Sequence, residues 1–242
     1  MSYRMEQVPI IQLIEKYNTG LDAIKRAPIV LENTGIKCLR IQDISQKKDY
    51  KNWGNTKVTP NDYRKFQLKK NYIMIARTGA SIGVMRLIDK DYKSVFNNGL
   101  IRLIPNELIV DPKYLFYNLI SDQCKNHIYG ISAGTATQPN MKMGDLLNYE
   151  INLPSLSRQK AIANILSSLD DKIELNNKIN KNLEELAQTL YKQWFVDFEF
   201  PNEDGEPYKS SGGEMVESEM GLIPKGWIIE NVTNLFVFKG GS

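Results

Sequence analysis

The 242 residues are 42% hydrophobic and 24% charged, the ordinary composition of a soluble protein with one or two domains. No apolar run approaches the roughly 20 residues of a membrane-spanning helix, and the opening MSYRMEQVPI lacks the apolar core of a signal peptide. Cys38 and Cys124 are the only cysteines, and they fit neither a metal site nor a disulfide framework. The sequence therefore predicts a protein of the reducing cytoplasm.

The two parts of the chain carry opposite charge. Residues 1–154 contain 22 Lys and Arg against 14 Asp and Glu, a net charge of +8, whereas residues 155–242 contain 9 against 14, a net charge of −5. Within residues 37–77, basic residues outnumber acidic ones by 11 to 3, with Asn, Trp and Tyr between them. This asymmetry indicates a polyanion partner for the basic part, and a lysine-rich solvated surface is the alternative.

Residues 1–154 alternate between strand and turn patterns and include one clear helix pattern. In chain order we expect a strand or helix at 5–17, a strand at 37–44, a long polar loop at 46–70, strands at 72–77, 84–88, 94–96 and 100–104, a helix from Pro112, a polar loop at 130–140 and a strand at 149–154. Turns at 78–83 and 97–99 are expected to join neighbouring strands. This order predicts the α+β class, with a mixed β-sheet and short helices.

A heptad pattern follows residue 154. Its two apolar lines contain Ile162, Leu169, Asn176, Leu183 and Leu190, and Ile165, Ile179 and Leu186. They predict a long coiled-coil-type helix, capped by Ser155 or Ser157 and ending near Phe195, roughly 60 Å long. Such an apolar edge needs a partner helix, and packing back onto the chain's own domain is the alternative. Asn176 is typical of a residue that sets helix register.

The chain changes character after the helix. Residues 201–226 are rich in Pro, Gly, Ser and Glu, which predicts a linker, and residues 227–242 weakly resemble the opening segment 8–20. We therefore expect three regions: a target-binding domain at 1–154, a long helix at 155–200, and a linker with the start of a second repeat at 201–242.

The sequence lacks the motifs of the common catalytic centres. It has no phosphate-binding loop of the ATPase type and no Asn/Asp-Pro-Pro-Tyr/Phe stretch of the kind that holds a flipped base. His127 is the only histidine, so Ser/His or Cys/His catalysis would depend on it alone. Asp197 and Glu199 form an acidic pair of the kind that a metal nuclease needs together with a nearby lysine, but an ordinary helix end explains them better. The pattern favours a non-catalytic binding module without a metal.

Seven segments taken together resemble the DNA-specificity subunits of type I restriction–modification systems. They are Arg77–Gly83, Gly134 with Gln138–Met141, Ile151–Leu156, Arg158–Ala163, Leu169–Asn176, Trp194–Pro201 and Gly205–Trp227. The resemblance covers nearly the whole chain, although Arg158 stands where the family commonly has an acidic residue. It implies a target-recognition domain followed by a helix that packs antiparallel to a second such helix.

The resemblance also implies partners. Methyltransferase subunits, which hold the S-adenosylmethionine, dock on the helices, and a restriction (nuclease) subunit joins them, so this chain needs no cofactor. Because the chain stops where a second recognition domain would begin, we expect a half-length or truncated form. Two copies would pair as a two-fold dimer through the residues of the two heptad lines and read two inverted half-sites of double-stranded DNA.

Candidate DNA contacts follow from the basic segment. For phosphates we expect Lys47, Lys48, Lys51, Lys57, Lys69 and Lys70, and for base edges Asn52, Asn55, Arg77 and Gln138. Glycines 79 and 83 are expected to shape a turn rather than contact DNA. A dimeric assembly factor or decoy, which binds methyltransferase subunits without reading DNA, is the alternative function.

Overall fold

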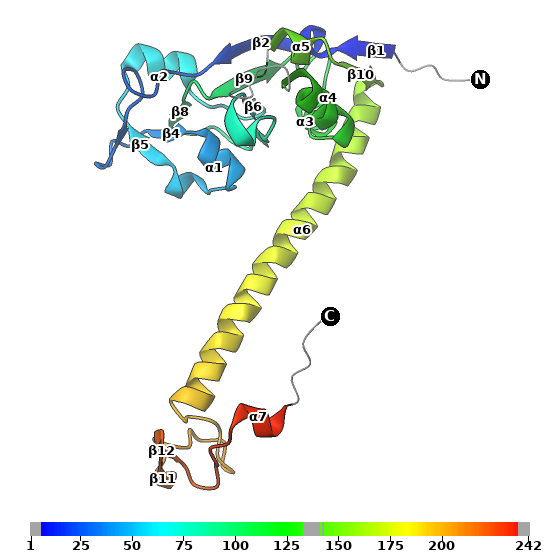
Figure 1. The fold of residues 1–242 in the computed structure, drawn as a ribbon. Helices are drawn as coiled ribbons and strands as arrows, with labels where there is room; N and C mark the ends of the chain where they lie inside the picture. Colours follow the sequence, from blue (N-terminus) through cyan, green and yellow to red (C-terminus); the bar gives the residue numbers. More distant parts are fainter. Residues whose placement is uncertain (1–5, 133–140, 142, 237–242) are drawn as a thin grey trace, which may run out of the picture. The chain divides into compact units, whose positions relative to one another are not determined.

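A computed structural model describes residues 6–132, 141 and 143–236 of the chain (Figure 1). The chain divides into two compact units, Met1–Asp170 and Asp171–Ser242, and each is described by itself. Gln138 lies outside the described residues. Among the described helices, none combines the length and the apolar character that crossing a membrane would require.

The first unit contains three small sheets. The central antiparallel sheet has the order β2 (Ile14–Thr19), β9 (Leu100–Pro105), β6 (Ile73–Ala76), β7 (Met85–Leu87). A second sheet has the order β3 (Ile29–Val30), β5 (Gly54–Thr56), β4 (Lys37–Leu39), β8 (Ser94–Phe96), with β4 and β8 parallel. The third pairs β1 (Glu6–Pro9) with β10 (Glu150–Leu153). The predicted α+β class with a mixed sheet is confirmed.

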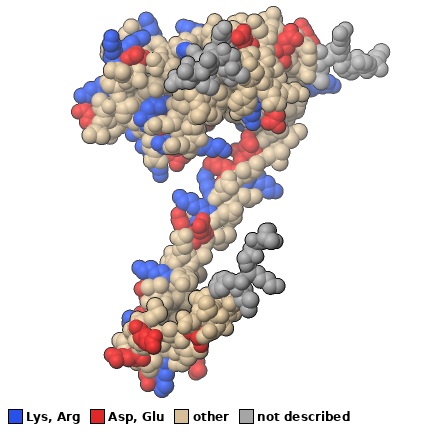
Figure 2. Space-filling view, viewed as in Figure 1, with Lys and Arg blue, Asp and Glu red and all other residues tan. Residues whose placement is uncertain are grey.

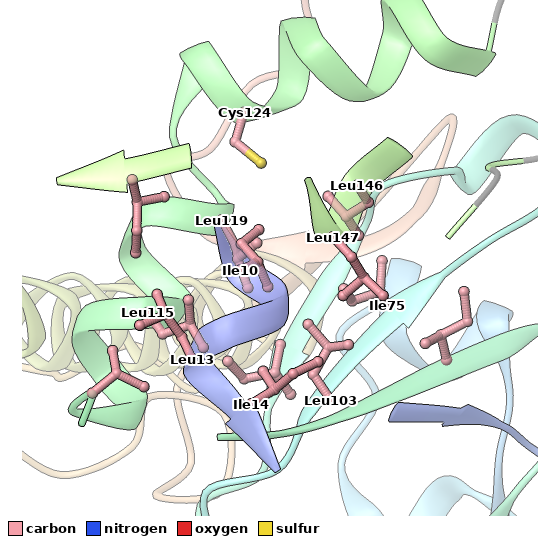
Figure 3. Close-up of a cluster of buried hydrophobic side chains, with 14 of the residues drawn as sticks. Ile10, Leu13, Ile14, Ile75, Leu103, Leu115, Leu119, Cys124, Leu146 and Leu147 are labelled. Carbon is pink, nitrogen blue, oxygen red and sulfur yellow. The ribbon is translucent and has the colours of Figure 1, made fainter. Parts of the chain in front are cut away.

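Strand β6 explains where the core lies. All four of its residues are fully buried, and successive residues point to opposite faces of the sheet. Ile73 and Ile75 therefore enter one hydrophobic cluster, whereas Met74 and Ala76 enter another. Figure 3 shows the first cluster, in which Ile75 lies among side chains from the N-terminal segment and from the helices that follow β9. The central sheet thus has a hydrophobic core on both faces.

The helices after β9 differ from the single helix that we predicted. Helix α3 (Pro112–Leu119) begins as expected, because the side chain of Asp111 accepts the amide N–H of Tyr114 at 3.0 Å. It ends at Leu119, and α4 (Asp122–Ser132) starts anew after Ser121. The hydroxyl oxygen of Ser121 accepts the amide N–H of Cys124 at 3.3 Å, so it satisfies a donor at the new helix start. A short helix α5 (Met143–Leu147) precedes β10.

The predictions for residues 37–70 are partly wrong. The strand at 37–44 ends at Leu39, and helix α1 (Ile41–Ser45) follows. The expected loop at 46–70 contains a turn of 3₁₀ helix (Tyr50–Asn52), strand β5 and helix α2 (Pro60–Phe66). Thr59 and Pro60 form the start of α2, because the Thr59 hydroxyl accepts the amide N–H of Asp62 at 3.1 Å.

Two turns that the sequence predicted have different outcomes. Between β6 and β7, Gly79 and Gly83 adopt positive φ angles of 75° and 77°, which confirms their expected role in a turn. Residues 97–99 do turn, since the amide N–H of Leu100 donates to the carbonyl of Asn97 at 3.0 Å, but the strands that they join do not pair, because β8 pairs with β4 whereas β9 pairs with β2 and β6. They carry the chain from one sheet to the other.

The predicted long helix is confirmed. Helix α6 (Leu156–Tyr191) crosses the boundary between the two units and continues into a π-helical turn at Lys192–Val196. The carbonyl of Ser155 accepts the first helical bond, from the N–H of Gln159 at 2.9 Å, which places Ser155 at the N-cap position. At the other end, Phe198 takes a left-handed conformation with φ 59° and closes the helix.

The second unit is held together by aromatic side chains. The ring of Trp227 lies 5.5 Å from the rings of both Phe198 and Phe200, and Phe200 stacks on Tyr208 at 4.7 Å. A hairpin of β11 (Met215–Ser218) and β12 (Gly221–Pro224) lies within residues 201–226, whose composition predicted a linker. The same residue types serve tight turns, and Gly221 has a φ of 99° in this hairpin.

The short helix α7 (Val232–Leu235) has the same length as the 3₁₀ helix η1 (Ile10–Leu13) near the N-terminus and similar flanking residues, although α7 is α-helical. Each has four residues between two extended residues, with φ/ψ of −68°/144° and −122°/143° around η1 and −70°/134° and −135°/140° around α7. Ile10 and Leu13 are fully buried, whereas Val232 and Leu235 are 57% and 63% exposed. The two segments are therefore alike in length and in their flanking residues, and they differ in helix type and in environment.

The two cysteines are buried and give a simple test of the fold. Burial raises the pKa of the Cys38 thiol from 9.0 to about 12 and that of Cys124 to about 11. Because the thiolate is the reactive form, we expect both to react with an aromatic disulfide reagent at least about 100-fold more slowly in buffer than in strong denaturant. Absorbance of the released thiol measures both rates. Fast reaction of two thiols in buffer would contradict the burial of these side chains.

Candidate nucleic-acid interface and helix seam

The candidate DNA-binding surface begins with the basic loop, which we define as residues 46–53 between α1 and β5. Lys47, Lys51 and Asn52 are exposed, and Lys47 has a φ of 49°, in the left-handed region. The chain therefore turns sharply at the first of these lysines. Three of the predicted DNA contacts thus lie together on one exposed segment.

Trp53 anchors the basic loop from inside the protein. Its ring is 2% exposed and lies 5.3 Å from the ring of Tyr50 and 5.2 Å from that of Tyr92. The indole N–H donates a hydrogen bond to the carbonyl oxygen of Lys48 at 3.0 Å. Arg86 donates to the same carbonyl at 2.8 Å, and its guanidinium lies over the Trp53 ring at 5.2 Å. The backbone of the basic loop is thus held at the Lys48 carbonyl by two hydrogen-bond donors, and the Trp53 ring packs against two tyrosine rings.

Lys48 differs from the other lysines of the basic loop. Its side chain is 30% exposed, and its Nζ lies 3.8 Å from Oδ1 of Asp43. Asp43 is fully buried, and it accepts hydrogen bonds from the amide N–H and the guanidinium of Arg40 at 2.9–3.2 Å. A cation that already compensates a buried carboxylate is less available to a phosphate.

Two further segments adjoin the basic loop. The hydroxyl of Tyr50 donates to the carbonyl of Lys93 at 3.1 Å, and the Nζ of Lys90 lies 5.6 Å from the centre of the Tyr92 ring. The amide N–H of Lys70 donates to Asp91 at 2.8 Å, and its neighbour Lys69 is exposed. Sequence reasoning missed Arg86, Lys90 and Lys93 because they lie outside the 37–77 segment. Figure 2 shows Lys and Arg side chains over α2 and beside α1.

Lys57 has a different neighbourhood. It lies 2.5 Å from Glu32, and with Lys25, Arg26 and Asp62 it lines an open hollow of about 380 Å³. The guanidinium of Arg26 pairs with Asp62 and holds the pKa of that carboxyl below its usual range. Arg26 and Lys57 thus both have carboxylate partners at this hollow, and their positive charges face negative ones.

The predicted base-reading residues have different environments. Asn52 is exposed, whereas Asn55 lies in β5, between β3 and β4, and its buried Oδ1 has no hydrogen-bond partner among the described residues. Arg77 is half-buried after β6, and its Nε is likewise buried without a partner in the described part of the chain. Gln138 is not described. Of the three that are described, only Asn52 lies in the basic loop.

The helix seam, defined as the eight residues of the two heptad lines, is uncovered. Its apolar side chains have exposed fractions between 37% for Leu190 and 64% for Ile165, and Asn176 is exposed as well. Ile173 and Leu175, beside the seam, are also exposed at 58% and 56%. The seam residues of the first unit, Ile162, Ile165 and Leu169, are therefore not covered by the described residues of that unit. The members of the seam are Ile162, Ile165, Leu169, Asn176, Ile179, Leu183, Leu186 and Leu190.

The described residues offer little for metal or acid–base chemistry. They contain no group of three His, Cys, Asp or Glu side chains arranged to hold a metal ion. His127 contacts the carbonyl oxygen of Asp145 at 3.2 Å and packs against Tyr149. Glu199 accepts two hydrogen bonds from Ser210 at 3.1 Å, which is the structural role expected of a helix-end carboxylate.

Comparison with known proteins gives a consistent result. The chain matches the family model for the type I restriction modification DNA specificity domain over residues 9–185. It is 34% identical over 147 residues to the HindI specificity subunit of Haemophilus influenzae. The matched region covers 60% of this chain and 32% of that relative. A putative specificity subunit of Methanocaldococcus jannaschii, MjaX, is 26% identical over 232 residues, covering 94% of this chain and 51% of the relative.

Solved structures agree with these sequence matches. The S subunit of the type I restriction–modification system of M. genitalium superimposes with a TM-score of 0.57 at 26% identity, covering 81% of this chain and 48% of the other. The HsdS subunit of Thermoanaerobacter tengcongensis has the same fold at 14% identity, with a TM-score of 0.53. The chain spans about a third to a half of the length of the curated relatives it matches. The family model covers most of α6 and nearly all of residues 6–154, which precede it and which we call the recognition fold, so the chain belongs to the family of type I restriction–modification DNA specificity domains.

Proposed function

We propose that the chain is the sequence-specific DNA-recognition subunit of a type I restriction–modification complex in the cytoplasm. Residues 1–154 would read the target, residues 155–200 would pair with another helix and dock methyltransferase subunits, and residues 201–242 would form a linker and the start of a second repeat. The family match over 9–185 carries this proposal, because it includes both the basic recognition fold and six of the eight seam residues, from Ile162 to Leu183. The subunit would be non-catalytic, with S-adenosylmethionine bound by the methyltransferase and cleavage performed by the restriction subunit.

The basic loop would supply the main contact with double-stranded DNA. Lys47 and Lys51 would neutralise phosphates, and Asn52, on the same exposed segment, would reach a base edge. Lys69 and Lys70 would extend the phosphate contact along the neighbouring turn. Lys48 and Lys57, which have carboxylate neighbours, remain candidates for phosphate contacts. Asn55 and Arg77, which each have a buried polar atom without a partner among the described residues, remain candidates for base contacts.

Pairing of two copies would complete the assembly. The exposed seam supports a homodimer, because a long apolar edge is stabilised when a second helix covers it. The similarity of α7 to η1 supports the view that residues 227–242 begin a second repeat. A two-fold pair would present two identical readers to two inverted half-sites.

Selection from a pool of random duplexes tests the proposed function. The purified chain is mixed with its cognate methyltransferase, bound duplexes are recovered and sequenced, and methylated adenines are mapped on the enriched DNA. We expect one bipartite, inverted sequence. Binding of the methyltransferase without enrichment or methylation of any sequence would instead support an assembly factor or decoy.

Substitution of single lysines tests the phosphate contacts. Lys51→Ala is expected to reduce the slope of log affinity against log salt concentration by about 0.9 for each bound copy of the chain, the contribution of one phosphate. Because Lys48 already faces Asp43, Lys48→Ala is expected to change the slope by less than about half of that amount. Fluorescence anisotropy with a labelled duplex at several salt concentrations measures both. Lys181→Ala on the exposed outer face of α6 is the control, and an unchanged slope for Lys51→Ala would exclude that contact.

A further inference from the structure

The start of α6 is attached to the recognition fold by one buried polar side chain, and we call this attachment the joint. Gln159, in the first turn of α6, is 1% exposed. Its side-chain nitrogen donates to the carbonyls of Pro154 at 2.8 Å and Ile109 at 3.2 Å, and its side-chain oxygen accepts the amide N–H of Asp111 at 2.8 Å. One amide thus ties α6 to the end of β10 and to the loop before α3. Since buried backbone groups need partners, it also satisfies three of them.

The same face of α6 continues to contact the recognition fold. Ala163, one turn after Gln159, is 1% exposed in the first hydrophobic cluster. Farther along, the hydroxyl of Tyr117 in α3 donates to the carboxylate of Asp170 at 2.7 Å. Residues 159, 163 and 170 share one helix face, whereas Ile162 and Ile165 of the seam remain exposed on another. The joint therefore fixes the helix without covering the seam.

We propose that Gln159 is a positioning residue that sets the direction in which α6 leaves the recognition fold. In the paired assembly, which rests on the proposed function, this direction sets the separation of half-sites that the dimer accepts. A domain of about 150 residues is roughly 35–40 Å across, so a rotation of about 10° at the joint moves its far side by about 6 Å. That is nearly two base-pair steps of about 3.4 Å.

Distance measurements on the full chain test the joint without DNA. Spin labels are placed at Lys93→Cys and Ser168→Cys, both exposed sites of the first unit, while the native cysteines are buried. Labelled chain is diluted with unlabelled chain so that only distances within one chain are measured. We expect one narrow distance distribution for the parent and a distribution at least about twofold wider for Gln159→Leu, because three backbone groups lose their partner.

Two further variants keep this test decisive. Gln123→Leu makes the same chemical change at an exposed site of α4 and is expected to leave the distribution unchanged. Tyr117→Phe removes only the hydroxyl that reaches Asp170, and a smaller widening is expected. If Gln159→Leu does not fold, Tyr117→Phe decides. An unchanged distribution for the folded Gln159→Leu variant, or for Tyr117→Phe in its place, would overturn the proposal.

The effect on spacing is measured separately with DNA. Duplexes carry two inverted half-sites at varied separations, and a second set carries one half-site. The parent is expected to select one separation, and Gln159→Leu to accept neighbouring separations while its binding to one half-site stays within about twofold, as for a change that leaves the base contacts intact. Equal selectivity in parent and variant would overturn the role in spacing. Absence of any binding by the parent would overturn the proposed function and leave the distance result to stand alone.

Discussion

Leu183→Asp is expected to convert a dimer of this chain into a monomer. Leu183 lies in the seam and is 57% exposed in the single chain, so its side chain is covered by the partner helix in the proposed pair. A buried Leu contributes about 1.5–3 kcal/mol, and two-fold symmetry removes two of them. An unpaired carboxylate in an apolar seam adds a further penalty. Dimer affinity should therefore fall by at least about 100-fold.

Light scattering coupled to size-exclusion chromatography measures this change across a range of protein concentrations. Gln188→Asp is the matched control, since it introduces the same charge on the exposed outer face of α6 and should leave the dimer intact. Circular dichroism shows whether the recognition fold is retained, which we expect because α6 leaves it after Ala163 and Asp170. A parent that is monomeric, or a Leu183→Asp variant that stays dimeric, would exclude the seam as the pairing surface.

The long helix could be predicted from sequence because its signals are local and repeated. Proline at 154, serine at 155 and an apolar residue every three or four positions fix a helix independently of the rest of the chain. Its exposed seam could also be anticipated, because seven of the eight seam positions are apolar while the opposite face of the helix is mostly polar or charged. The structure confirms the helix from Leu156 and leaves the pairing as a proposal.

Residues 37–70 could not be predicted as well because tertiary contacts decide their structure. Strand β5 has only three residues and is defined by its pairing with β3 and β4, which are far from it in sequence. Helix α2 did carry a local signal, the Thr59-Pro60 pair followed by Asp62, but the high polarity of the segment favoured a loop. Short strands of this kind have weak intrinsic preferences.

In the candidate site, too, some residues could be predicted from local sequence and others depend on tertiary packing. The lysines of the basic loop could be found by counting charges, because they are close together in sequence. Arg86, Lys90 and Lys93 could not, since they approach the loop through Trp53, Tyr92 and Tyr50. Likewise, sequence alone grouped Lys48 with Lys47 and Lys51, whereas the buried Asp43 distinguishes it. Charge composition thus locates a surface, and packing decides which charges are available.

Trp53→Ala is expected to lower the free energy of unfolding by about 3–5 kcal/mol, in the range for loss of a buried Trp. The substitution removes a ring that is 2% exposed, its contacts with two tyrosines and the bond to the Lys48 carbonyl. Chemical denaturation followed by circular dichroism measures the change. Tyr129→Ala, whose ring is 58% exposed, is the control and should cost less than about 1 kcal/mol.

Trp53→Phe distinguishes the effect of Trp53 on the free energy of unfolding from its effect on DNA affinity through the basic loop. It keeps a ring for Tyr50 and Tyr92 but lacks the indole N–H, so the Lys48 carbonyl retains only the bond from Arg86. We expect a loss of about 1 kcal/mol in unfolding free energy, the size of one hydrogen bond. If the anchor also orders the basic loop for DNA, affinity should fall in the order parent, Trp53→Phe, Trp53→Ala under conditions where all three are folded. Equal affinity for the three proteins would show that the loop binds without its anchor, and phosphate contacts would then have to be sought on other lysines.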